Sequence, residues 1–382
     1  MQRREFLTLM TGTAIMAVIA PQSQSTAFNS NRKTLVVIEL AGGNDGLNTI
    51  VPYRDPNYLK LRPTIAIKDA LPISDRVALH PALSELKSIL DQNRLAIIQN
   101  VSYPNPNLSH FRAKDIWQSG QVSGNPTTGW LGRYLSNSQA KTAEAIFLGE
   151  EYPLALTNEK ELYLQLSPRL AVQKRGKLGK ALQAVYRQPQ TSALAEQVRR
   201  SVLESEAAVQ QLTKDIDRRS ENHGYAKTAI GKQFAMLGRV LESQPRVIYL
   251  TIGGWDTHVG QMKRHQQLLT DLSAGLSALE RDMQANGWQK NVLVMVQSEF
   301  GRRPAENGSG GTDHGTAGPV LLLGNVRGNL YGGQPALDSL VAGNLAMQVD
   351  FRQIYGEILN QWLNVPAHKI LGQDFASLSL LG

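Results

Sequence analysis

Acidic and histidine side chains follow short apolar segments at three separate places in the chain. Carboxylate oxygens and imidazole nitrogens are ligands that divalent metal ions take in proteins. Apolar segments rich in β-branched residues are typical of strands buried on both faces, and open α/β sheets bind their ligands beyond the carboxyl ends of such strands. The pattern therefore predicts metal ligands at one sheet edge: Asp45 after Thr34–Leu40, Asp256 and His258 after Val247–Ile252, and Glu299 after Val292–Val296.

A glycine-rich loop after Glu299 adds Asp313 and His314 to this set. Four acidic residues and two imidazoles at one edge would repel each other unless a cation neutralised them. A turn such as that around Asp45 also occurs without any ligand, so the prediction depends on the whole set. Mixed nitrogen and oxygen ligands predict one or two divalent ions, namely zinc, manganese or magnesium, and a pair of such ions is typical of phosphoryl transfer.

A second candidate group lies in the segment SYPNPNLSHF, where prolines and asparagines predict a loop that ends near Ser109. A helix is expected to begin there, so Ser109 is either its N-cap or a nucleophile at a helix N-terminus, where backbone N–H groups stabilise anions. His110 is a ligand, a base or a packed side chain. Arg112 and Arg302 are candidates for binding the anionic oxygens of a substrate.

Strands and helices are predicted to alternate along the chain, which indicates a mostly parallel sheet with helices on both faces. The region from Glu159 to about Ala226 differs, because it is polar and has helical spacing; it predicts a helical insertion with exposed helices at Leu170–Val185 and Leu194–Leu212. The other predicted strands are Leu95–Gln99, Ala145–Leu148 and Val320–Leu323, and the other predicted helices begin near His80 and Ser109 or span Ala229–Leu241, His265–Ala285 and Asp350–Leu363.

The N-terminus has the pattern of an export signal. Arg3 and Arg4 open a twin-arginine motif, Thr8–Ala20 is modestly apolar, and Ser25–Ala27 offers small residues for cleavage. The alternatives are a cytoplasmic tail or an uncleaved anchor. We expect a signal peptide at residues 1–27, a single domain at 28–382, export by the twin-arginine translocase, and a periplasmic or extracellular location.

Composition excludes several other classes of protein. The 382 residues are 42% hydrophobic, enough for a sizeable core, and the net charge of +8 is spread without a long basic run, so nucleic-acid binding is not expected. The absence of cysteine excludes disulfides, thiolate metal sites and a cysteine nucleophile. No integral membrane span is expected in the mature chain.

Five motifs, in order between Thr34 and Leu363, resemble the exported family labelled domain of unknown function 1501, which is similar to the alkaline phosphatase and sulfatase superfamily. The motifs are GGNDGLN, SHF-x-A-x-D-I-W, GGWDTH, SEFGR and GTDHG-x-A. The resemblance implies a three-layer α/β/α sandwich with a two-metal centre. It also implies the following roles: Asp45, Asp256, His258, Glu299 and His314 as metal ligands, and Ser109 as the nucleophile.

Two departures from the superfamily pattern shape the functional expectation. Glu299-Phe300 stands where adjacent aspartate and histidine are common, so Asp313-His314 compensates or a single metal binds. Ser102-Tyr103-Pro104-Asn105-Pro106 lacks the arginine that a formylglycine sulfatase requires. The sequence therefore predicts a metal-dependent hydrolase of phosphate or sulfate esters, acting on a small or polymer-borne anionic substrate. The alternative is a catalytically degenerate metal- or anion-binding envelope protein.

Overall fold

The computed structural model describes residues 32–138, 140, 144–159, 163–166, 188, 192, 196, 199, 203 and 224–382. The predicted signal peptide lies outside the described residues, and so does nearly all of the predicted helical insertion. The division of the chain at residues 27 and 28 therefore stays a prediction. Within the described part, no helix is both long enough and apolar enough to cross a bilayer.

The described chain builds one large sheet of nine strands in the order β11-β5-β10-β9-β1-β8-β6-β7, with β12 paired to β5. Of these described strands only β10 runs antiparallel to its neighbours. The strands are β1 (Thr34–Ala41), β5 (Leu95–Ser102), β6 (Ala145–Leu148), β7 (Leu164–Leu166), β8 (Val247–Gly253), β9 (Val292–Gln297), β10 (Gly318–Gly324), β11 (Leu330–Tyr331) and β12 (Val349–Asp350).

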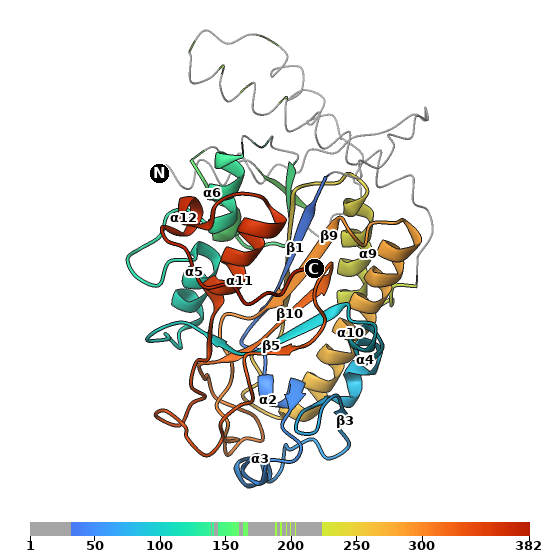
Figure 1. The fold of residues 1–382 in the computed structure, drawn as a ribbon, viewed down its shortest axis with the longest axis vertical. Helices are drawn as coiled ribbons and strands as arrows, with labels where there is room; N and C mark the ends of the chain where they lie inside the picture. The colour runs from blue at the N-terminus through green and yellow to red at the C-terminus, as the bar shows by residue number, and fades with distance from the viewer. Residues whose placement is uncertain are drawn as a thin grey trace.

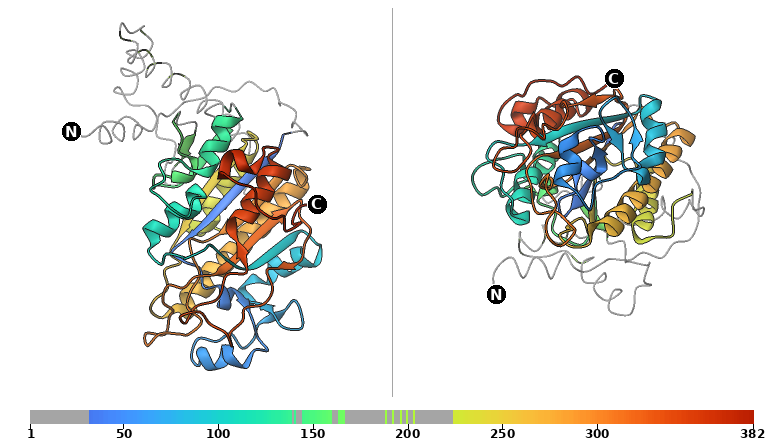
Figure 2. Two further views of the ribbon diagram at one scale, coloured as in Figure 1. Left: turned by 60° about the vertical axis from the view of Figure 1, so that its left-hand side comes forward. Right: turned by 90° about the horizontal axis from the view of Figure 1, so that it is seen from below.

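Helices cover both faces of this sheet, which confirms the predicted α/β/α sandwich (Figures 1 and 2). Side chains of β1 show why, since Val36 and Ile38 enter one apolar core while Leu35 and Val37 enter the other. The first core is closed by η1 (Pro81–Leu83), α4 (Ser84–Asp91), α9 (Ala229–Leu241) and α10 (Gln261–Ala285). The second is closed by α5 (His110–Ser119), α6 (Trp130–Asn137), η3 (Leu154–Leu156), α11 (Phe351–Glu357), the π-helical turn η4 (Ile358–Trp362) and α12 (Ala367–Leu371).

A smaller unit lies beyond the carboxyl end of β1, at the lower end of Figure 1. It has its own apolar cluster. It also contains Arg62, which follows α3 and pairs with Asp45. The unit contains α2 (Gly46–Thr49), α3 (Pro56–Leu61) and a three-stranded antiparallel sheet of β2 (Ile50–Val51), β4 (Ala78–Leu79) and β3 (Leu71–Pro72).

The sheet register brings three loops together. β1 pairs in parallel with both β8 and β9, so that Ala41 lies opposite Gly253 and Glu39 lies opposite Gln297. The loops that leave these strands therefore start side by side. Helix α10 begins at Gln261, four residues before the predicted start at His265, because the leucine spacing on which the prediction depends begins only at Leu268.

His265 on α10 makes folding pH-dependent. Its side chain is buried, its Nε2–H donates to Asn44 Oδ1 at 2.9 Å, and burial lowers its pKa to about 4. The folded protein keeps this histidine neutral, whereas the unfolded chain protonates it below about pH 6.5.

We therefore expect the free energy of unfolding to fall by roughly 3 kcal/mol from this residue alone between pH 6.5 and pH 4. Urea unfolding across this range measures the slope of the free energy of unfolding against pH. His265→Gln should reduce this slope by the amount that corresponds to about one proton taken up on unfolding. An equally steep slope in the variant would contradict this assignment.

Candidate metal centre

Four side chains from three separate segments converge at the carboxyl edge of the sheet. Asp256 and His258 follow β8, and His110 is the first residue of α5. His314 comes from the return loop before β10, where an isolated β-bridge pairs it with Arg302. Ligand atoms of His110, Asp256 and His314 all lie within 4.8 Å of one another.

The Nε2 atoms of all three histidines face the Asp256 carboxylate. His258 Nε2 lies 3.0 Å and His314 Nε2 3.3 Å from Asp256 Oδ1, and His110 Nε2 lies 3.5 Å from Oδ2. The Nε2 atoms of His258 and His314 are only 2.9 Å apart. At this separation one nitrogen can donate its hydrogen to the other, or both can face a shared cation. The Asp256 carboxylate beside them favours positive charge at this point.

The opposite ring nitrogen of each histidine has an oxygen partner. Nδ1 of His314 lies 2.8 Å from the Leu108 carbonyl oxygen, which can only accept, so this nitrogen carries the proton. The Nδ1 atoms of His110 and His258 face carboxylates. Metal-ligating histidines characteristically donate their second N–H to a carboxylate or a carbonyl, which aims the other nitrogen at the metal. All three histidines have this arrangement.

Glu299 orients His110. Its buried carboxylate lies 2.8 Å from His110 Nδ1 and accepts hydrogen bonds from the N–H groups of Gly42 (2.8 Å) and Gly43 (3.3 Å) and from the Ser298 hydroxyl. Burial alone would raise the pKa of Glu299, but the hydrogen bonds from His110 and the backbone outweigh burial and lower it. The same hydrogen bond raises the pKa of His110. Glu299 is therefore ionised, and both of its carboxylate oxygens accept hydrogen bonds from the protein.

Asp313 is exposed and contacts the Nδ1 side of the His258 ring. Its Oδ1 lies 3.4 Å from His258 Nδ1 and accepts from Asn307 Nδ2 at 3.0 Å. The hydrogen bond from Asn307 is the main reason that the pKa of Asp313 is lowered. Asp313 thus faces Nδ1 of His258, and the Asp256 carboxylate faces Nε2 of the same ring.

Arg302 positions Asp256. Its side chain is fully buried, and Nη2 donates to Asp256 Oδ1 at 2.6 Å. It also donates to backbone carbonyls, including those of Gly43 (2.7 Å from Nε) and Thr312 (2.8 Å from Nη1), and Nη1 lies 3.4 Å from His258 Nε2. Partial burial raises the pKa of Asp256, but the hydrogen bond and charge of Arg302 hold it below its ordinary value. The guanidinium of Arg302 is engaged within the protein, and its predicted role in substrate binding stays a prediction.

Asp45, the remaining predicted ligand, is paired with a guanidinium. Asp45 and Arg62 are both completely buried, and two hydrogen bonds of 2.6 and 2.9 Å join them. Gln261 Nε2 also donates to Asp45 Oδ2. Burial would raise the pKa of Asp45, but Arg62 outweighs burial and lowers it. The negative charge of Asp45 is therefore neutralised without a metal ion.

Ser109 occupies the N-cap position of α5, yet its side chain forms no capping hydrogen bond. The residue is exposed, and its backbone N–H donates to Asn107 Oδ1 at 2.9 Å. Ser109 thus has the backbone position of a cap without using its hydroxyl as one, and its predicted role as a nucleophile stays a prediction. Arg112, partly buried, lies on the first turn of the same helix.

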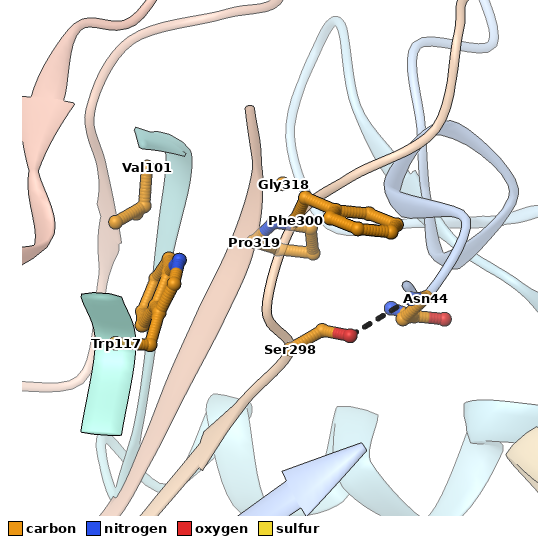
Figure 3. Close-up of a pocket in the computed structure, with 7 residues that line it drawn as sticks. All are labelled: Asn44, Val101, Trp117, Ser298, Phe300, Gly318 and Pro319. Carbon is orange, nitrogen blue, oxygen red and sulfur yellow. Dashed lines mark hydrogen bonds between the residues drawn. The ribbon is translucent and has the colours of Figure 1, made fainter. Parts of the chain in front are cut away.

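Phe300 packs against two of the histidines, whose rings also contact each other. Its ring centroid lies 4.9 Å from that of His110 and 4.7 Å from that of His314. Phe300 also lines a small cavity with room for about one water molecule, too small for a substrate. Figure 3 shows this cavity between Trp117 on one side and Asn44 and Ser298 on the other, with Asn44 N donating to Ser298 Oγ at 3.0 Å.

The chain is similar to solved structures at low sequence identity. The C-terminal periplasmic domain of EcEptC from Escherichia coli, in complex with Zn, is 9% identical, with 78% of this chain and 74% of that chain covered and a TM-score of 0.38. A protein in the alkaline phosphatase superfamily from Vibrio parahaemolyticus is 10% identical, with 92% and 78% covered and a TM-score of 0.35. Alkaline phosphatase from the Antarctic bacterium TAB5 is 9% identical, with 78% and 94% covered and a TM-score of 0.33. Similarity of this degree does not extend an activity to this chain.

No curated protein matches the chain. A family model does match, over residues 32–370, which is most of the chain and includes all of the candidate site. The chain belongs to the family described as "Protein of unknown function (DUF1501)".

Proposed function

We propose that this protein is an exported metal-dependent hydrolase of phosphate or sulfate esters. The observation that carries the proposal is the convergence of three histidine Nε2 atoms on Asp256, each ring being oriented through Nδ1 by an oxygen acceptor. Three imidazoles and one carboxylate match the ligand number and type of zinc, and manganese is the nearest alternative.

The proposed ligands are His110, Asp256, His258 and His314. A divalent ion held by them would polarise the ester oxygens and neutralise negative charge that develops during the reaction. Glu299 and Asp313, predicted as ligands from the sequence, take the roles of orienting carboxylates in this proposal, because they face the Nδ1 atoms. Asp45 takes no direct part, because Arg62 and Gln261 hold its carboxylate.

Ser109 is the proposed nucleophile. Its Oγ would lose its proton to solvent and bond to the phosphorus or sulfur of the ester as the bond to the alcohol oxygen breaks. The leaving alkoxide would take a proton from solvent, and water would later hydrolyse the covalent ester, which returns a proton to Ser109. The N-terminal N–H groups of α5 and the side chain of Arg112 would bind the anionic oxygens. Support comes from the exposed position of Ser109 beside His110 and from a hydroxyl that forms no cap.

Ser109→Ala should lower turnover of an aryl phosphate or aryl sulfate by about 1,000-fold or more, since it removes the attacking atom. Its metal content and melting temperature should stay at wild-type values, because the hydroxyl caps nothing. Thr228→Ala is the matched control, since Thr228 does cap α9 by accepting a hydrogen bond from the Gly231 N–H at its Oγ1 atom. This control should lose about 1 kcal/mol of stability and keep its turnover. Full turnover in Ser109→Ala would contradict the proposed nucleophile.

A second candidate is a metal-binding protein without catalysis. It is favoured by the engagement of Arg302 and Arg62 within the protein, because these two guanidinium groups are then not free to bind a substrate oxyanion. Metal binding without turnover of any ester, unchanged in Ser109→Ala, would select this candidate.

Export through the twin-arginine translocase is proposed from residues 3–27 of the sequence. Replacing Arg3 and Arg4 together with lysine keeps the charge and removes the paired guanidinium groups that define the motif. We expect the variant to accumulate inside the cell while the wild type is exported, as measured by fractionation. Equal export of both would exclude this route.

A further inference from the structure

A polar stripe runs along the face of α5 that meets the sheet. His110, Lys114 and Gln118 are spaced four residues apart, so their side chains lie above one another on one side of the helix. His110 contacts Glu299, and Gln118 Nε2 donates to Glu39 Oε2 at 2.7 Å. Only the first member of the stripe belongs to the candidate metal centre.

Glu39 is an unusual residue for its position. It lies on β1 in the centre of the sheet, is only 3% exposed, and accepts a hydrogen bond from the Tyr249 hydroxyl. Its Oε1 has no hydrogen-bond partner among the described residues, and Lys114 Nζ lies 3.5 Å away. Burial raises the pKa of the Glu39 carboxyl, an effect that the Lys114 ammonium opposes. A buried carboxylate of this kind costs stability, so the fold alone gives no reason for it.

Lys114 and Gln118 tie α5 to a second segment as well. Lys114 Nζ lies 2.7 Å from Glu151 Oε2, in the loop after β6. Gln118 Oε1 accepts from the N–H of Ala155 at 3.2 Å. The helix is therefore fixed one and two turns beyond His110, both to the central strand and to the segment that follows β6.

We propose that Glu39 and Lys114 are positioning residues that hold α5 so that His110 Nε2 faces Asp256. This inference rests on the proposed metal site. Metal ligands must be held within about 0.5 Å of their productive positions, and α5 carries His110 on its first turn without a side-chain cap. The contacts at Lys114 and Gln118 then fix the rotation of the helix, and Glu299 fixes the imidazole ring.

The test compares zinc affinity with stability. Glu39→Gln should weaken zinc binding about 10-fold, as loss of a supporting contact does, while its free energy of unfolding stays equal or rises, because a buried charge is removed. Lys114→Met should also weaken zinc binding, and Lys114→Arg should restore it. Glu280→Gln is the matched control, since Glu280 is buried on α10 and paired with Arg94 at 2.8 Å, in the opposite helix layer. Its zinc affinity should equal that of the wild type.

Wild-type zinc affinity in both Glu39→Gln and Lys114→Met would overturn the inference. Absence of zinc binding in the wild type would instead overturn the proposed function, and crystal structures of the zinc-free proteins then decide the inference. We expect His110 Nε2 to face Asp256 in the wild type and the first turn of α5 to be displaced in Lys114→Met. An unchanged position of α5 and of the His110 ring in Lys114→Met would overturn it.

Discussion

Replacing Asp256 with asparagine should lower zinc affinity by at least about 100-fold, the largest effect expected of any single change in the site. The amide keeps the size of the side chain and can still accept from Arg302, so the variant should fold. It removes the one negative charge that all three histidine Nε2 atoms face. Calorimetric titration with zinc at pH 7.5 measures the change.

Asp313→Asn is compared with this variant, because it should weaken zinc binding by a smaller factor. Among the proposed ligands, Asp313 contacts His258 through its Nδ1 atom, at 3.4 Å, and Asp313 is exposed. Its replacement should cost about 10-fold in zinc affinity, the lower end for a residue that orients a ligand. If Asp256→Asn bound zinc as tightly as the wild type, or if Asp313→Asn had the larger effect, the proposed ligand set would be wrong.

Replacing Arg62 with methionine should destabilise the fold by about 3–5 kcal/mol, because it leaves the Asp45 carboxylate buried without its counter-charge. Both side chains are completely inaccessible to solvent, and Arg62 also donates to the Pro304 carbonyl oxygen through Nε at 2.8 Å. Urea unfolding measures the loss.

The double variant Asp45→Asn, Arg62→Met should recover more than half of that stability, since no unpaired charge remains. Lys87→Met is the control for loss of an ion pair, because its partner Asp91 is exposed and only one helical turn away. Exposed pairs of this kind contribute about 0.5 kcal/mol or less. An Arg62→Met protein within about 1 kcal/mol of the wild type would show that the Asp45 charge is compensated in some other way.

The sheet and most helices were predictable because their signals are local. Thr34–Leu40 and Val247–Ile252 are apolar and β-branched, and each structural strand extends the predicted one by a single residue. The carboxyl ends of parallel strands meet at one edge, so the gathering of Asp256, His258 and Glu299 also followed from the pattern. The sequence could not show which nitrogen or oxygen each side chain would present.

The roles within the site depend on contacts between distant segments. Arg62 lies in a loop with no motif around it, and its pairing with Asp45 becomes visible only in the folded chain. The sequence leaves the role of His110 open between a ligand, a base and a packed side chain. Nothing local shows that Glu299, 189 residues away, lies beside it. Arg302 carried a charge that suggested anion binding, but burial commits its donors to backbone carbonyls and Asp256.

The most direct measurement is the metal content of the full chain by elemental mass spectrometry, with the wild type compared with His314→Ala and Asp45→Asn. We predict about one equivalent of a divalent metal in the wild type, a loss of metal in His314→Ala, and full retention in Asp45→Asn, because Arg62 already neutralises Asp45. About two equivalents, with one lost in Asp45→Asn, would instead place a second ion at Asp45 and contradict the single-metal site. Absence of metal from the wild type would contradict the metal centre itself.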